Sequence, residues 1–385
     1  MNPPRDLTIN FVCTQPSLSG ACKATKLLAE ALVRRGHRVH ILYLCDRPWP
    51  SFSQPRRLLR HLRTLWESGG NKAHHFESST ATLVPVHGTR VEARDVPEAD
   101  ISIGIMWETR EWIESWPASK GLKAYIVTGD ERLRGGDTAR IEAVHRMPGL
   151  HLAVASWVQR LLEEHYGIED STLLPNGVEQ DLLASPSRGR GTPPTVGLMY
   201  GRSPLKGAQV AFDAIRLAQK QVPALQTIAF GAASLHGTHH PPEPFEFHLR
   251  PEQEQLPMIY RRADCWLLPS TSEGFGMPGL EAAASRCPVI ATRCGGPADY
   301  IREGISGHLV DVGDVPCMAQ RLVDVLTCDA ARWRSMSDAG HAIASKYTWD
   351  CSASILEQAI QARRERSQGS QVASPMAAQL EERPA

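Results

Sequence analysis

The chain lacks the features that mark several large classes of protein. Its nine cysteines are scattered, odd in number and never in C-x-x-C spacing, which argues against a disulfide framework or a zinc site. No apolar run approaches the ~18 residues of a membrane span, and Met1–Asp6 has no hydrophobic signal core. These absences predict a reduced, cytoplasmic protein.

An excess of one charge is also missing. Lys plus Arg and Asp plus Glu both number 42, so the formal net charge is zero. No overall field therefore favours nucleic acid or an anionic membrane, and such contacts would require a local patch. We expect no nucleic-acid partner.

What is present is a repeated alternation of strands and helices. A chain of 385 residues exceeds the size at which one hydrophobic core stops growing, which predicts two domains. In the first half, buried strands are expected at Leu7–Cys13, Arg38–Leu44, Asp100–Ile105, Lys123–Thr128 and Leu152–Ser156. In the second half, they are expected at Thr195–Tyr200, Leu225–Phe230, Ala263–Leu268, Pro288–Thr292 and Gly307–Val310. The pattern predicts an α/β fold with two Rossmann-like, doubly wound domains facing a central cleft.

Composition divides the chain into its expected parts. Residues 1–184 form the N-terminal domain, and residues 185–194, rich in proline, glycine and serine, form a linker. The second domain begins at residue 195. Residues 363–385 are polar and short of large apolar side chains, so we expect a disordered tail there.

The corner Pro269–Glu281 is the most informative segment of the chain. It follows a buried strand, leads into a helix, and contains two carboxylates, Glu273 and Glu281, together with three glycines. Acid groups and bare backbone N–H groups thus meet at the carboxyl end of a strand. In open α/β sheets, phosphate-bearing ligands bind at this place.

A second corner, Gly201–Gly207, joins the strand ending at Tyr200 to a helix that begins at Ala208. Its two cations, Arg202 and Lys206, and its two glycines suit a diphosphate, whose charge the helix terminus and the side chains would share. Taken alone, the segment is equally compatible with a basic turn on a solvated face. Its combination with the Pro269–Glu281 corner favours phosphate binding.

The glycines of the later corner also match a dinucleotide fingerprint, Gly274-x-Gly276-x-x-Gly279, so a nicotinamide or flavin enzyme is an alternative. That fingerprint usually follows the first strand of its domain and needs an acid at the end of the next strand. Here the next strand ends in Arg293-Cys294, and Asp299 lies beyond a Gly-Gly turn. The context argues against the dinucleotide interpretation.

These motifs resemble those of the family 4 retaining glycosyltransferases, which have the GT-B fold of two Rossmann-like domains. The similar segments are Pro175–Val178, Gly201–Gly207, Tyr260–Asp264, Pro269–Ala282, Pro288–Gly296, Gly304–Gly307 and Tyr347–Trp349. In the family, the last of these begins a final helix that crosses back to the first domain. The resemblance thus implies a second domain over 195–345 and a crossing helix over 346–362.

The resemblance implies roles for the charged residues of both corners. Arg202 and Lys206 would hold the donor diphosphate, although only three residues separate them here, where the family commonly has five. Glu281 would accept hydrogen bonds from the ribose hydroxyls, since an ionised carboxylate can accept from two vicinal hydroxyls.

Glu273 would contact hydroxyls of the transferred sugar and stabilise positive charge that develops at the anomeric carbon. The backbone N–H groups of Gly274, Phe275 and Gly276 would assist it.

In the first half, the resemblance points to Gly20 and Asp130. Gly20 lies in the loop Pro16–Ala21, where it would allow close approach to phosphate; a glycine that merely relaxes a turn is the alternative. Asp130 occupies a position where the family often carries a histidine near the sugar. It could bond a sugar hydroxyl or orient the acceptor, or it could be the N-cap of the next segment.

The helix expected over residues 55–66 has leucines and a tryptophan on one face and four arginines on the other. This pattern suits peripheral contact with the inner face of a membrane or with an anionic acceptor. An ordinary surface helix docked by its apolar face is the alternative.

Metal ligands are not expected. The pairs His74-His75 and His239-His240 have no cysteine or carboxylate at ligand spacing, which favours solvated loop histidines. The chain also lacks an Asp-x-Asp motif, by which the other major glycosyltransferase fold holds a metal on the diphosphate. We expect metal-independent transfer with no cofactor besides the donor.

The sequence therefore predicts a cytoplasmic, retaining glycosyltransferase of hexosyl or deoxyhexosyl type that uses a nucleoside-diphosphate sugar. Its acceptor would be a glycan, a lipid-linked or a small-molecule hydroxyl, in cell-surface glycan or natural-product glycoside synthesis. The alternatives are a phosphorylase or epimerase of the same fold, or a catalytically silent carbohydrate-binding subunit. The joint presence of Lys206, Glu273 and Glu281 argues against a subunit that has lost catalytic activity.

Overall fold

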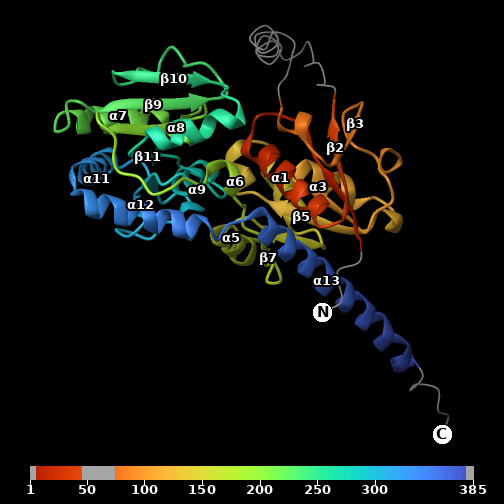
Figure 1. Cartoon of the computed structure of the whole chain (residues 1–385). Helices are drawn as coiled ribbons and strands as arrows, with labels where there is room; N and C mark the ends of the chain where they lie inside the picture. The colour runs from red at the N-terminus through yellow and green to blue at the C-terminus, as the bar shows by residue number, and fades with distance from the viewer. Residues whose placement is uncertain (1–5, 46–73, 379–385) are drawn as a thin grey trace.

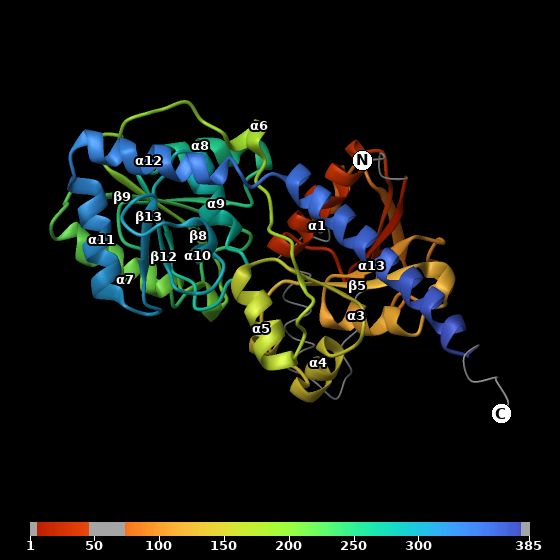
Figure 2. The same cartoon turned by 90° about the horizontal axis from the view of Figure 1, so that it is seen from below.

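The computed structural model describes residues 6–45 and 74–378, with the side chains of Arg134 and 367–378 left undescribed. The helix expected over residues 55–66 lies outside the described residues. Two α/β domains lie side by side, and a long C-terminal helix runs from one along the other (Figures 1 and 2).

The first domain is built on a parallel sheet of seven strands in the order β3-β2-β1-β4-β5-β6-β7. The strands are β1 (Thr8–Val12), β2 (Arg38–Leu44), β3 (Thr82–Val86), β4 (Ile101–Gly104), β5 (Leu122–Val127), β6 (Leu150–Ala153) and β7 (Thr172–Leu173). The α-helices are α1 (Gly20–Arg34), α3 (Trp107–Glu114), α4 (Thr138–His145), α5 (Ser156–Tyr166) and α6 (Gln180–Leu183). Short 3-10 helices are η1 (His75–Ser78), η2 (Ala93–Asp95), η3 (Ala118–Lys120) and η4 (Glu131–Arg134).

Two helix starts in this domain differ from the expected ones. The sequence predicts an amphipathic helix that starts at Thr25, whereas α1 begins at Gly20, because the Ser19 hydroxyl caps it by accepting a bond from the Cys22 backbone N–H. The sequence also predicts Ser156 as the N-cap of a helix over residues 157–166, but Ser156 is the first residue of α5 and bonds to the second domain.

The second domain repeats the plan with a six-stranded parallel sheet in the order β10-β9-β8-β11-β12-β13. Its strands are β8 (Thr195–Tyr200), β9 (Gln226–Gly231), β10 (Phe245–Leu249), β11 (Cys265–Leu268), β12 (Val289–Thr292) and β13 (Gly307–Val310). Its helices are α7 (Ala208–Gln219), α8 (Leu256–Arg262), α9 (Met277–Ala284), α10 (Pro297–Tyr300), α11 (Val315–Thr327), α12 (Ala330–Ala344), η5 (Pro204–Lys206) and η6 (Gln253–Gln255).

Helices cover both faces of this second sheet, as the alternation along β11 shows. Cys265 and Leu267 belong to the core shared with α7 and α11. Trp266 and Leu268 point to the opposite face and join a larger core that extends into the first domain. Since successive side chains of a strand point to opposite faces, this apolar strand is buried from both sides.

The strands absent from the sequence prediction, β3, β7 and β10, all lie at sheet edges. Strand β3 contains Pro85, which an edge tolerates because one row of its backbone groups is unpaired. Strand β10 has only exposed and half-buried residues and lacks the continuous apolar run of a central strand. Edge position thus explains why their sequence signals are weak.

The last helix, α13 (Trp349–Ala378), crosses back to the first domain and packs beside α1 (Figure 2). The structure continues this helix through residues 363–378, where the sequence predicts a disordered tail. Arginine, glutamate and glutamine favour helix even without an apolar face. Ion pairs also tie the segment down: Arg363 lies 2.9 Å from Asp170, and Arg364 lies 2.6 Å from Asp100.

Among the described residues, no helix has the length and apolar character needed to cross a membrane.

Candidate functional site

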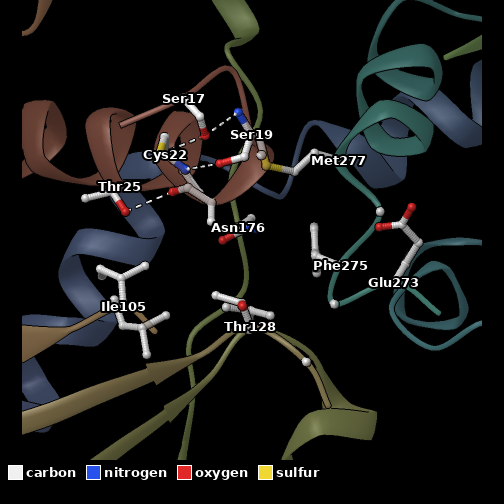
Figure 3. A pocket seen from close by; sticks show the side chains of 18 of the residues that line it. Ser17, Ser19, Cys22, Thr25, Ile105, Thr128, Asn176, Glu273, Phe275 and Met277 are labelled. Carbon is white, nitrogen blue, oxygen red and sulfur yellow. Dashed lines mark hydrogen bonds between the residues drawn. The ribbon is translucent and has the colours of Figure 1, made fainter. Parts of the chain in front are cut away.

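The strand order places a crevice in each domain. The order reverses between β1 and β4 in the first sheet and between β8 and β11 in the second. At such switch points the connections leave the sheet in opposite directions and open a crevice at the carboxyl ends of the strands. A cavity of about 690 Å³ lies there, lined by residues of both domains. The two domains thus share one site (Figure 3).

Lys206 and Glu273 meet on the second domain's side of the cavity. Because β8 and β11 are neighbours, the corners that follow them are adjacent, and Lys206 Nζ lies 2.7 Å from Glu273 Oε1. The Ser270 hydroxyl donates to the same carboxylate oxygen at 2.7 Å. The Lys206 side chain is 32% exposed to solvent. The carboxylate therefore positions a cation that an anion in the cavity can still reach.

Glycine lets the two corners approach so closely. Gly207 has a φ of 62° and caps the N-terminus of α7, and a Cβ there would collide with the carbonyl oxygen of Pro269. A larger residue would separate the Lys206 corner from the Glu273 corner.

The second corner also presents bare backbone donors. Gly274, Phe275 and Gly276 line the cavity just before α9 begins. Within the described part of the chain, their N–H groups have no hydrogen-bond acceptor. Unpaired N–H groups at a helix N-terminus favour a negative ligand. Together with Lys206, they make this wall suited to a phosphate.

The opposite wall comes from the first domain. Gly20 lines the cavity at the start of α1, and a Cβ at Gly20 would meet nothing within 4 Å. Packing therefore does not demand glycine here. Met277 reaches from the second domain toward Ser19 and Cys22, while Thr128 lies just beyond the end of β5 in the first domain (Figure 3).

Asp130 lines the cavity, and its carboxylate is bonded to the nearby Arg132. Its carboxylate accepts from the Arg132 guanidinium at 2.8 and 2.9 Å and from the Arg132 backbone N–H at 3.1 Å. Burial alone would raise the pKa of Asp130, but these bonds from Arg132 outweigh it and lower the pKa. The structure thus shows the N-cap role, with a carboxylate held ionised by its own loop.

Arg202 does not join Lys206. Its guanidinium donates to the backbone oxygen of Ser234 at 2.9 Å and to the Ser234 hydroxyl at 2.6 Å, and it is not among the residues that line the cavity. In the sequence, Arg202 and Lys206 are separated by fewer residues than is common in the family. In the structure, the Arg202 side chain is bonded to Ser234 and does not line the cavity.

Glu281 is likewise absent from the cavity lining, because it is buried and already paired. Lys23 of α1 donates to Glu281 Oε1 at 2.7 Å, and the Tyr260 hydroxyl donates to Oε2 at 2.6 Å. The sequence did not predict a role for Lys23, because the expected helix began at Thr25, two residues after it. A lysine on the otherwise apolar face of α1 is the signal that could have revealed it.

Other direct bonds join the domains next to the cavity. The Trp157 indole donates to the Gly274 carbonyl at 2.8 Å. The Asp299 carboxylate accepts from the Ser156 backbone N–H at 2.8 Å and from its hydroxyl. Asp299, weighed above as the acid of a dinucleotide fingerprint, thus serves the domain interface.

The histidine pairs have local partners. His74 caps η1, which begins at His75, and both side chains are partly buried rather than solvated. His239 Nδ1 lies 2.9 Å from the Tyr200 hydroxyl, and of these four histidines only His240 is exposed. In the described ranges, no group of three or more His, Cys, Asp or Glu residues is placed to hold a metal ion.

Comparison with known proteins supports the resemblance. Residues 194–328 match the family model of glycosyl transferases group 1. A D-inositol 3-phosphate glycosyltransferase of Corynebacterium kroppenstedtii is 34% identical over 166 residues, which cover 40% of this chain and 37% of that protein. A phosphatidyl-myo-inositol mannosyltransferase of Mycobacterium tuberculosis is 31% identical over 220 residues, or 53% of this chain and 57% of that protein.

Among solved structures, Anabaena Alr3699/HepE in complex with UDP and glucose matches with a TM-score of 0.69 and 16% identity, covering 92% of this chain and all of that one. TarM matches with a TM-score of 0.69 and 9% identity, over 94% of this chain and all of that one. These likenesses show the GT-B fold. The chain spans between 11% and 57% of the length of the curated relatives it matches.

Proposed function

Because the chain carries a domain of glycosyl transferases group 1 within a GT-B fold, we propose that it transfers a sugar from a nucleoside-diphosphate donor to an acceptor hydroxyl, with retention of configuration. One observation carries the proposal: Lys206 and three residues whose backbone N–H groups have no partner among the described residues line a cavity at the switch point of the second sheet. This arrangement offers positive charge where a diphosphate would lie.

The donor is proposed to bind with its diphosphate between Lys206 and the N-terminus of α9. Departure of the nucleoside diphosphate places negative charge on the leaving oxygen. A fixed cation and fixed N–H dipoles stabilise that charge more in the transition state than in the ground state. These groups supply the positive charge, so we propose that transfer needs no metal.

Glu273 would act from the same wall. Its carboxylate positions Lys206 at 2.7 Å and lies beside the place proposed for the transferred sugar. There it can accept bonds from sugar hydroxyls and stabilise positive charge at the anomeric carbon. The N–H groups of Gly274, Phe275 and Gly276 are proposed to hold the sugar and the diphosphate in place.

The acceptor would enter from the first domain's wall. Asp130 is held ionised by Arg132, so it is suited to orienting a hydroxyl as an acceptor of its hydrogen bond. The leaving phosphate would take the proton of the attacking hydroxyl, as the family resemblance implies. We propose that closure of the domains around the bound donor reduces the access of water to the reacting groups. We propose a glycan, a lipid-linked compound or a small molecule as acceptor, and a cytoplasmic site of action.

A thermal-shift panel tests the donor class. UDP, GDP, TDP and ADP and their sugars are added to the full chain in the presence of EDTA. A ligand that binds only the folded state stabilises it by ~2.7 kcal/mol at a hundred times its Kd. We expect one nucleobase series to raise the melting temperature. A panel in which every nucleotide leaves the melting temperature unchanged would contradict the proposal.

A further inference from the structure

A buried lysine connects the two domains beside the cavity. Lys23 of α1 in the first domain is 8% exposed, and its Nζ lies 2.7 Å from Glu281 Oε1 on α9 of the second domain. A second carboxylate, Glu179 of the first domain, lies 3.2 Å from the same Nζ. One cation is thus shared between carboxylates of both domains.

The charges around Lys23 keep it protonated. Burial by itself would lower the pKa of Lys23, but Glu281 and Glu179 outweigh this and raise it. The neighbouring His75 adds no charge at neutral pH, because burial and the Lys23 cation lower its pKa to about 4. The site therefore holds one ammonium and two carboxylates, and the lysine keeps a partner if either carboxylate is taken away.

Glu281 is closed off from a ligand in this arrangement, because it is buried behind its two donors. Its Oε1 accepts from Lys23 and its Oε2 accepts from Tyr260, and the carboxylate does not line the cavity. A ribose in the cavity could reach Glu281 only if one of these donors moved. Tyr260 is fully buried within the second domain, so Lys23, which belongs to the other domain, is the donor that domain motion can remove.

We propose that Lys23 is a positioning residue that latches the domains together through Glu281, and that the ribose hydroxyls of the donor displace it onto Glu179. The inference rests on the proposed function, together with the ribose-binding role that the family resemblance implies for Glu281. It makes release of the latch a step of donor binding. Ribose and Lys23 then compete for one carboxylate, so removal of the lysine charge strengthens nucleotide binding, whereas removal of the Glu179 charge weakens it.

The test measures binding of UDP and of 2′,3′-dideoxy-UDP to the full chain by calorimetry, or the corresponding pair for the nucleobase that the thermal-shift panel selects. Lys23→Met keeps the length of the side chain without its charge, and Lys23→Arg keeps the charge. We expect Lys23→Met to bind UDP about 5- to 150-fold more tightly than the wild type, the usual range of coupling between sites. Lys23→Arg restores the wild-type affinity, and the dideoxy nucleotide shows no gain.

Glu179→Gln gives an independent arm, because it leaves the Lys23–Glu281 bond intact and removes only the carboxylate that receives the displaced lysine. We expect weaker UDP binding and unchanged dideoxy-UDP binding. If Lys23→Met lacks a cooperative unfolding transition and is therefore not properly folded, Glu179→Gln alone tests the proposal. If both residues had only a structural role, we would not expect UDP affinity to rise in Lys23→Met and to fall in Glu179→Gln.

The outcomes separate the latch from the proposed function. If UDP binds the wild type but Lys23→Met changes the affinity for both nucleotides equally, or weakens it, the latch is wrong and the proposed function stands. If no nucleoside diphosphate binds the wild type or any variant, the proposed function fails and the latch fails with it.

Discussion

At the scale of single residues, Gly274 controls how closely the domains approach. A Cβ at this position would collide with the Thr128 carbonyl oxygen of the other domain. We expect Gly274→Ala to lower sugar transfer on the order of 10²-fold, because small misplacements of reacting groups have effects of that size. The melting temperature should also fall, because the collision separates domains that share one hydrophobic cluster. Initial rates with the nucleotide sugar, together with melting curves, provide the measurement.

Gly189→Ala is the matched control, because a Cβ there meets nothing within 4 Å. It should leave both the rate and the melting temperature unchanged. If Gly274→Ala transfers sugar as fast as the wild type, close contact between Gly274 and Thr128 is not needed for the reaction.

The residues also show what a single sequence can reveal. Lys206 and Glu273 were predictable as one site because each follows a central strand and lies in a recognisable corner. Their direct contact follows from the adjacency of β8 and β11. The Lys23–Glu281 pair was not predictable, since 258 positions separate the two residues and no local pattern links them. The direction of the Arg202 side chain depends on Ser234, which lies on another loop.

At the scale of elements, α13 fastens the two domains to each other. Glu357 on this helix accepts bonds from Arg35 at 2.6 and 2.7 Å and lies 2.8 Å from His37 Nε2. The bonds from Arg35 lower the pKa of Glu357 in the folded protein below its ordinary value, against the opposing effect of burial. The ion pair therefore stabilises the docked helix only while Glu357 is ionised.

This depressed pKa predicts a pH dependence of stability. The stabilisation from Glu357 is fully present above its unfolded pKa of about 4.3 and is lost as the pH falls through the lower folded pKa. Glu357→Gln should lower the free energy of unfolding by about 1–3 kcal/mol near neutral pH. The difference from the wild type should shrink on the acid side of that pKa. Urea unfolding of both proteins across this range is the measurement.

Glu365→Gln makes the same chemical change at an exposed position of α13 and serves as the control. It should lower stability by much less at every pH. A Glu357→Gln deficit that stays constant as the pH falls would show that the carboxylate charge does not hold the helix.

At the scale of elements, burial also decided which parts of the fold were predictable. The central strands β1, β8 and β11 were visible as apolar runs because helices or the other domain cover both of their faces. The edge strands β3 and β10 and the polar end of α13 were not visible. Their formation depends on neighbours, on β2 and β9 for the strands and on Asp100 and Asp170 for the helix.

At the scale of the whole molecule, the two sheets act as one framework. A single hydrophobic cluster contains Ile9 and Phe11 of the first sheet together with Trp266 and Leu268 of the second. The switch points of both sheets lie beside the shared cavity. The domain contacts are thus apolar at the centre and polar beside the cavity, where Lys23 and Asp299 lie. A ligand that binds between the domains can therefore change their contacts.

The most direct test of the account is release of nucleoside diphosphate from nucleotide sugars, with acceptor extracts or water as the receiving hydroxyl. The account predicts release by the wild type and a loss on the order of 10²–10³-fold in Lys206→Gln, the effect of removing one preorganised donor. Arg202→Gln, whose side chain is bonded to Ser234, should stay close to the wild type. No release from any nucleotide sugar, or undiminished release by Lys206→Gln, would contradict the account.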